Sequence, residues 1–178
     1  MHDLRTPLAT VNGFARTLER TELDERAKHF VSLMVAACDQ LAGLLDDLGL
    51  AVRIESGVWE PNLRVTDTRE LASAAEAVAE GAVTVVGPGG AVRTDVDEAR
   101  RALYHLARCA IRHGGLDHLD VRAEGVVIAL SPVSPEVAPI LLAENLRDLG
   151  AAVAQRVLRA VGASAELQAD RLSIRFPE

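Results

Sequence analysis

The first residues of this chain carry the side chains whose types and spacing best suit chemistry. His2 is followed directly by Asp3, and Thr6 lies one helical turn further on. A neutral imidazole is a nucleophile near physiological pH, and a neighbouring carboxylate can hold one ring nitrogen as the N–H donor while the other attacks. The pattern therefore predicts a nucleophilic histidine that Asp3 orients.

The elements that must position this histidine can be predicted from the apolar spacing around it. Apolar residues recur at alternating steps of four and three positions, which is the seam of a helix that packs along another helix. In the first segment this seam consists of Leu4, Leu8, Val11, Ala15 and Leu18. His2 lies off the seam, so a helix over residues 3–20 is expected to present it to solvent.

The same spacing recurs after a polar turn at residues 21–24 and predicts a second helix over residues 24–55. Its seam consists of Phe30, Met34, Ala37, Leu41, Leu44 and Leu48. Two amphipathic helices joined by a short turn form an antiparallel hairpin, which leaves one side of each seam uncovered. Pairing with a second copy into a four-helix bundle covers that side, so a homodimer is expected.

The residues around the histidine also carry a resemblance to a known family. The sequence His2-Asp3-Leu4-Arg5-Thr6-Pro7-Leu8 resembles the phosphoacceptor box of two-component sensor histidine kinases, in which the histidine is phosphorylated. The resemblance extends through residues 45–57, so residues 1–57 are expected to form the dimerisation and phosphoacceptor hairpin. In the family a helix precedes this box. A fragment, a misassigned start codon and a native truncation therefore all remain open.

The second part of the chain, residues 62–178, alternates strands and helices, which predicts an α+β protein whose hairpin is followed by a two-layer α/β sandwich. The order resembles the ATP-binding domain of histidine kinases. The expected elements are a strand at 62–66, a helix at 68–79 capped by Thr68, a hairpin of strands 83–86 and 91–94 around Gly87–Gly90, a helix at 97–113, strands at 119–123 and 126–130, a helical region at 139–162 interrupted near Gly150, and a last strand or hairpin at 167–176.

Three departures from the family pattern indicate that this second domain is degenerate. Where the family presents a Mg²⁺-binding asparagine, the alignment places His105 and Cys109, which are poor partners for a hard cation. The strand that should lead to an adenine-binding Asp and to glycines leads instead into the proline-rich residues 131–135. The region of the glycine-rich lid keeps Gly150 but places Asp148 where phosphate would approach.

The histidines and the cysteine of the helix expected at 97–113 do not predict a metal site. His105, Cys109 and His113 follow each other at steps of four, with His118 near, but this spacing spreads the ligands over two helical turns and separates the outer pair. We therefore expect no metal ion and no cofactor on this chain.

The overall composition argues against several classes of partner and environment. The net charge is −7, and Lys28 is the only lysine, which argues against a nucleic-acid footprint. Cys38 and Cys109 imply no disulfide framework, so a reducing cytoplasm is the expected compartment. The most apolar run, residues 126–143, contains three prolines and a glutamate, so membrane insertion of this segment is not expected.

The favoured function is a histidine phosphotransferase of a phosphorelay, which passes a phosphoryl group between receiver aspartates through His2 without binding ATP. The resemblance implies that Asp3 orients His2, that Thr6 can orient water, and that Mg²⁺ is held by the partner receiver. The expected docking face consists of Arg5, Ala9, Asn12, Gly13 and Arg16. The alternatives are a divergent sensor kinase fragment that still uses ATP, and a non-catalytic dimerisation scaffold.

Overall fold

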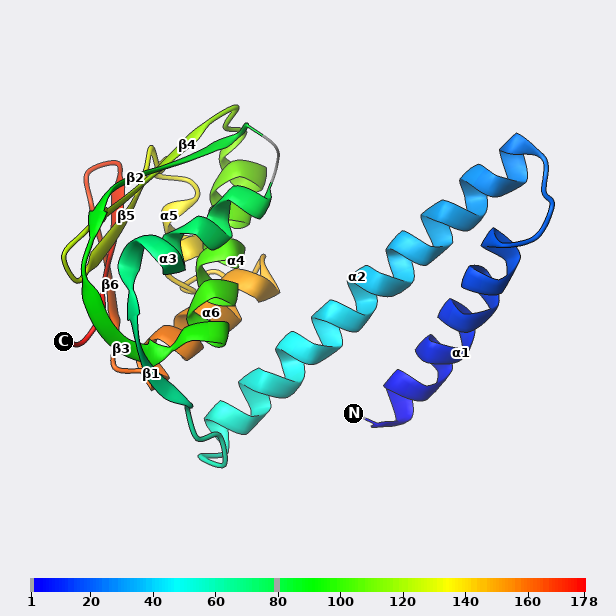
Figure 1. The fold of residues 1–178 in the computed structure, drawn as a ribbon, viewed down its shortest axis with the longest axis horizontal. Helices are drawn as coiled ribbons and strands as arrows, with labels where there is room; N and C mark the ends of the chain where they lie inside the picture. The colour runs from blue at the N-terminus through cyan, green and yellow to red at the C-terminus, as the bar shows by residue number, and fades with distance from the viewer. Residues whose placement is uncertain (1, 79–80) are drawn as a thin grey trace. The chain divides into compact units, whose positions relative to one another are not determined.

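The computed structural model describes the backbone of residues 2–78 and 81–178, and the side chains of these residues except that of His2. The chain forms two compact units, which meet in sequence between Leu50 and Ala51 (Figure 1). The first unit is helical, and the second contains both helices and strands. Each unit is described separately below.

The first unit is an antiparallel pair of helices, α1 (His2–Glu19) and α2 (Glu25–Glu55), the latter continuing past the unit boundary. The carboxylate of Asp24 caps α2 by accepting a hydrogen bond from the backbone N–H of Ala27 at 2.8 Å. Both predicted helices are confirmed, with ends that differ by one residue. In the described part of the chain, no helix combines the length and the apolar character that crossing a membrane would require.

The side chains buried within the hairpin are not those that the spacing of α2 predicted. Ala15 of α1 is buried together with Val31, Val35 and Cys38 of α2. The predicted seam of α2 lies next to this set, and its Phe30 and Leu41 remain about half exposed. The apolar residues of α2 thus form two adjacent stripes, and the predicted seam is the more exposed of the two in the single chain.

The second unit is built on a five-stranded sheet of order β2-β4-β5-β7-β6. Its strands are β2 (Val83–Gly89), β4 (Leu119–Glu124), β5 (Val127–Ser131), β6 (Ser164–Gln168) and β7 (Arg171–Arg175). The β2–β4 pair is parallel and the other pairs are antiparallel. A separate antiparallel ribbon pairs β1 (Leu63–Asp67) with β3 (Ala91–Asp95).

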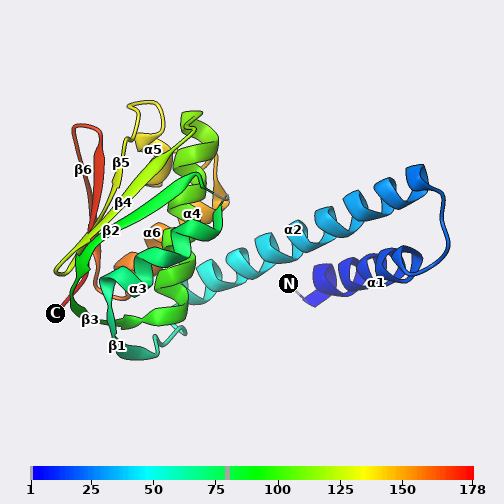
Figure 2. The same ribbon diagram turned by 45° about the horizontal axis from the view of Figure 1, so that its top comes forward.

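Helices cover one face of this sheet, as Figure 2 shows. They are α3 (Thr68–Ala72), the 3-10 helix η1 (Ser73–Val78), α4 (Val96–Gly114), α5 (Ala138–Leu141) and α6 (Leu149–Ala160). The core between the layers is aliphatic, with Leu106 and Leu158 from the helices and Ile128 and Leu172 from the strands fully buried. The predicted two-layer α/β sandwich is confirmed.

The predicted hairpin of strands 83–86 and 91–94 was wrong. The two strands exist, but β2 pairs with β4 and β3 pairs with β1. The glycines that suggested a tight turn instead let backbones approach closely. Gly87 has a φ of +104°, and a side chain there would collide with the backbone of Ala123 in β4. Local composition suggested a tight turn here and gave no indication of the partner strands, which are β4 for β2 and β1 for β3.

Two helix boundaries also differ from expectation. The cap of α3 is Asp67, whose carboxylate accepts a hydrogen bond from Arg69 N–H, rather than Thr68, and Ala79 lies outside the described residues. The expected helical region at 139–162 consists of α5 and α6, separated by residues 142–148. Gly150 lies in the first turn of α6 rather than at the interruption, because Asp148 caps that helix.

Candidate functional site

The residues predicted to do chemistry lie at the start of α1. His2 is the first helical residue, but its side chain lies outside the described part of the structure. Asp3 and Thr6 are exposed, so both are accessible to a partner. The helix therefore places these positions on successive turns, as the spacing predicted, while the contacts of the imidazole itself are not described.

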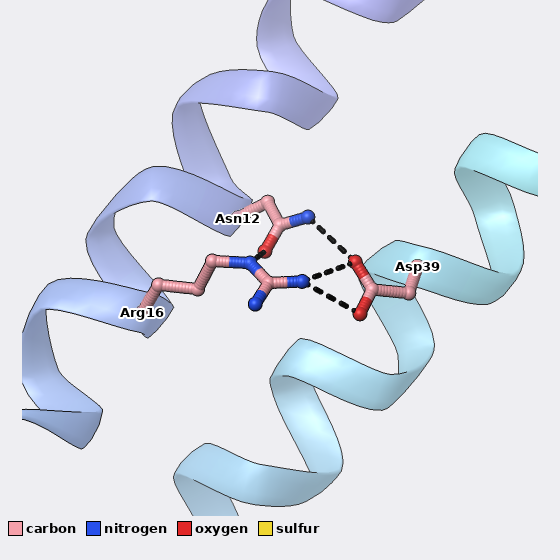
Figure 3. Close-up of polar contacts among 3 residues, drawn as sticks. All are labelled: Asn12, Arg16 and Asp39. Carbon is pink, nitrogen blue, oxygen red and sulfur yellow. Dashed lines mark hydrogen bonds and ion pairs between the residues drawn. The ribbon is translucent and has the colours of Figure 1, made fainter.

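The side chains of Asn12 and Arg16 of α1 converge on Asp39 of α2, in what we call the interhelical bridge (Figure 3). Arg16 Nη2 lies 2.9 and 2.8 Å from the two carboxylate oxygens, and Asn12 Nδ2 donates to Asp39 Oδ1 at 2.9 Å. Arg16 Nε also donates to Asn12 Oδ1 at 3.0 Å. The hydrogen bonds from Asn12 and then Arg16 lower the pKa of Asp39 below its usual value, so the bridge persists into mildly acidic solution.

A second ion pair joins the helices nearer the start of α1. Arg5 Nη2 lies 2.6 Å from Asp46 Oδ1, and both side chains remain more than half exposed. Beside this pair is a pocket of about 240 Å³, to which Leu8, Ala9 and Asn12 also contribute. Three of the predicted docking residues, Arg5, Ala9 and Asn12, therefore line one hollow between α1 and α2. Sequence reasoning did not identify Asp39 or Asp46, since the pairing depends on how the two helices are aligned.

In the second unit, a cluster of polar side chains lies between α4 and the start of α6. Cys109 and His113 face Asp148, and one ligand atom from each lies within 4.8 Å of the others. His113 Nε2 is 3.2 Å from Asp148 Oδ2, while Asp148 Oδ1 accepts a hydrogen bond from Ala151 N–H at 2.9 Å. Burial, reinforced by the charge of Asp148, raises the pKa of the Cys109 thiol to about 12. We call Cys109, His113 and Asp148 the three-ligand cluster.

Comparisons of the sequence with known proteins identify one matching family and several similar proteins. Residues 1–57 match the His Kinase A (phospho-acceptor) domain family. The sensor protein DivL of Caulobacter vibrioides is 32% identical over 121 residues, which are 62% of this chain and 16% of DivL. Histidine kinase 5 of Arabidopsis thaliana is 33% identical over 57 residues, which are 32% of this chain and 6% of that protein.

The structural comparison covers both units. The crystal structure of full-length ShkA in complex with AMPPNP has a TM-score of 0.73 and 22% identity, covering 99% of this chain and 44% of that one. The ATP-binding domain of PrrB from Mycobacterium tuberculosis has a TM-score of 0.53 and 24% identity, covering 65% of this chain and 97% of that domain. Residues 1–57 therefore carry the match to the phospho-acceptor domain family, and the chain shares the fold of these solved structures. It spans only a small part of the length of its curated relatives.

Within this histidine kinase fold, the segment that follows β5 contributes apolar side chains to the core. After β5 the chain does not open into a glycine-rich segment, and Val133, Val137 and Ile140 are buried instead. Gln155 of α6 donates from Nε2 to the carbonyl oxygen of Leu141 at 2.7 Å, which fastens the segment after β5 to α6. The prolines noted in the sequence therefore belong to a segment that packs into the core.

Helices α4 and α6 approach each other closely in this histidine kinase-like unit, and Gly150 permits the approach. A Cβ atom added at Gly150 would lie 2.5 Å from His105 Nδ1, and His105 is itself buried. We expect Gly150→Ala to lower the free energy of unfolding of the second unit by about 1–3 kcal/mol, the usual cost of an overpacked core. Urea denaturation followed by circular dichroism measures this change.

The matched control for Gly150→Ala is Gly43→Ala. Gly43 also lies within a helix, but an added Cβ there meets no atom within 4 Å. Because alanine favours the helix over glycine, Gly43→Ala should leave stability unchanged or raise it. Equal stability of Gly150→Ala and the unmodified protein would contradict tight packing of His105 on α6.

Proposed function

We propose that this chain is a histidine phosphotransferase that relays phosphoryl groups through His2 and does not use ATP. Support for the first half comes from the phosphoacceptor domain, in which His2 begins α1 and is followed by Asp3 and Thr6. Support for the second half comes from the sequence of the second unit, in which proline-rich residues 131–135 and Asp148 stand where the resemblance leads us to expect nucleotide-binding residues.

The observation that carries the proposal is the position of Asp148. Its carboxylate caps α6 and occupies the positive end of the helix dipole, where the lid helix of a nucleotide-binding relative would face phosphate. Asp148 is almost fully buried, so a phosphate placed there would meet a fixed negative charge. ShkA, which has a similar fold, was crystallised in complex with AMPPNP. In this chain we propose that the carboxylate of Asp148 takes the position that a phosphate group would otherwise approach.

The proposed reaction is the transfer of a phosphoryl group from one aspartate to another. The free ring nitrogen of His2 attacks the phosphorus of a receiver aspartyl phosphate, an N–P bond forms, and the aspartate leaves as a carboxylate. A second receiver aspartate then attacks the phosphohistidine and regenerates the imidazole. Asp3 holds the other ring nitrogen, and Mg²⁺ bound by the receiver neutralises the charge that develops.

The proposed partners are a second copy of the chain and receiver domains. A second copy would cover the apolar stripe that α1 and α2 leave exposed, which includes Val11, Phe14, Phe30, Met34 and Leu41. A receiver would dock over Arg5, Ala9, Asn12, Gly13 and Arg16. The pocket beside Ala9 can accept an apolar side chain, and the ion pairs at its edges keep α1 and α2 in register while it does so.

The experiment that tests the proposal is phosphotransfer from a panel of phosphorylated receivers, with and without Mg²⁺-ATP. We expect a receiver to label the chain in the absence of ATP, and Mg²⁺-ATP alone to give neither a label nor a saturable rise in melting temperature. Labelling by ATP alone would identify a divergent kinase. The absence of a label from every receiver would instead favour the scaffold.

A further inference from the structure

The three-ligand cluster brings together side chains of the kinds that bind transition metals. Cys109 and His113 lie one turn apart on α4, and Asp148, the N-cap of α6, completes the set 35 residues after His113. The arrangement differs from the His105, Cys109, His113 and His118 set weighed from the sequence. Because the third ligand comes from a second helix, the three atoms can surround one point instead of spreading along α4.

From this arrangement we propose that Cys109, His113 and Asp148 bind one Zn²⁺ ion that clamps the start of α6 to α4. A thiolate, an imidazole and a carboxylate are the donors that zinc accepts, and three protein ligands with water in the fourth position form a tetrahedral site. Mg²⁺ prefers an octahedron of oxygen atoms, which this cluster does not offer.

The surroundings of Asp148 prepare it to act as a ligand. One carboxylate oxygen is already held by the N–H of Ala151, which fixes the orientation of the group, and the other oxygen points toward His113. Outer hydrogen bonds of this type orient metal ligands and are part of a metal site. The ligand atoms lie within 4.8 Å of one another, so side-chain movements of about an ångström bring them to coordination distance.

The charges at the site balance when zinc is bound. Binding breaks the Sγ–H bond of Cys109, releases its proton to solvent and forms a Zn–S bond, and the two anionic ligands then neutralise the ion. Burial and the charge of Asp148 outweigh the opposing charges of Arg108 and Arg112 at the thiol, so the metal ion itself must displace the proton. His113 is one quarter exposed, so the ion can enter from its side although Cys109 is fully buried.

The proposed Zn²⁺ lies in the region where the resemblance to histidine kinases would place a nucleotide-bound Mg²⁺ ion. Cys109 stands at one of the positions aligned with the magnesium-binding asparagine, and Asp148 stands at the start of the lid helix. Zinc would then fix the two helices that a nucleotide would otherwise bridge. This site does not depend on phosphotransfer through His2, so either proposal can fail without the other.

The test is titration of the metal-free full chain with Co²⁺, which reports a thiolate ligand through a charge-transfer absorption band. We expect one Co²⁺ per chain, a thiolate band with the intense visible absorption of a tetrahedral site, and loss of both when one equivalent of Zn²⁺ is added. A large excess of Mg²⁺ should leave the spectrum unchanged. Zn²⁺ should also raise the melting temperature of the second unit in a concentration-dependent manner.

Substitutions of a buried ligand, a partly exposed ligand and two residues outside the cluster distinguish loss of metal binding from misfolding. Cys109→Ser should abolish the thiolate band. His113→Gln, at a partly exposed position, should weaken binding by at least the ~10–100-fold that loss of an outer-shell partner costs. Cys38→Ser and His118→Gln are the matched controls, because Cys38 is a buried thiol of α2 and His118 is exposed and pairs with Asp120.

Two results would overturn the site. One is a cobalt spectrum without a thiolate band, or with a band that survives Cys109→Ser. The other is the absence of saturable binding by a chain that is folded according to circular dichroism, which would leave His113 and Asp148 as an ordinary ion pair. Binding that is lost equally in His118→Gln would also count against the cluster.

Discussion

Replacing His2 by alanine should abolish labelling of the chain by phosphorylated receivers, and the loss should be complete. No described side chain near the start of α1 offers another nitrogen nucleophile, since the nearest other histidine, His29, lies on α2 at the opposite end of the hairpin. Acid-labile phosphate on the protein, measured with a radiolabelled receiver, reports the reaction. Circular dichroism and the melting temperature should not change, because His2 is the first residue of the helix.

The control for His2→Ala is His29→Ala, which removes a histidine of the same hairpin and should retain the label. Asp3→Asn should reduce the rate of labelling without abolishing it, because the carboxylate orients the nucleophile and does not itself accept the phosphoryl group. If His2→Ala retained a stable label, the assignment of the phosphoacceptor would be wrong. A label of equal stability lost only in His29→Ala would move the site to α2.

Charged substitutions in the exposed apolar stripe of α2 should strongly weaken dimerisation of the chain. Phe30 and Leu41 are each about half exposed in the single chain, and both belong to the apolar stripe next to the buried residues Val31, Val35 and Cys38. Full burial of an exposed side chain of this kind is worth about 1.5–3 kcal/mol, so burying the remaining half of four such side chains across a symmetric dimer contributes about 3–6 kcal/mol. Phe30→Asp combined with Leu41→Asp should therefore weaken dimerisation by at least ~10²-fold.

Analytical ultracentrifugation over a range of concentrations measures this dissociation. The matched control is Gln40→Glu, which adds a charge to an exposed polar position of the same helix and should leave the dimer intact. The second unit should keep its melting temperature in both variants, because its core lies within residues 51–178. A double variant that remains dimeric at low micromolar concentration would exclude this stripe as the interface.

The sequence predicted the helices well because their signal is local. The seam of α1 and the capping residue Asp24 of α2 both lie within a few positions of the boundaries they determine. It was harder to predict which of the two apolar stripes of α2 is buried, because Phe30 and Val31 are neighbours and both are apolar. Only the side-to-side alignment with α1, fixed in part by Arg16 and Asp39, separates the inner stripe from the outer one.

Pairings between distant segments could not be predicted in the same way. Gly87 indicated a reversal of the chain, yet its conformation serves the approach of β2 to Ala123, which lies 36 residues later. The three-ligand cluster poses the same difficulty, since Cys109 and His113 show their spacing in the sequence while Asp148 joins them only through the packing of α4 on α6. In the sequence, an aspartate before a helix indicates only an N-cap. Asp148 is such a cap, so its sequence context does not indicate its second position beside Cys109 and His113.

The two cysteines lie in different units, and both are buried, Cys38 in the hairpin and Cys109 in the sandwich. A buried thiol reacts with an alkylating reagent mainly during a transient opening, so its rate of modification in the metal-free chain measures how often its surroundings open. The chain thus contains one intrinsic kinetic probe for each unit. Comparing their rates, by mass spectrometry of the two peptides, separates the local stability of the helical hairpin from that of the α/β sandwich.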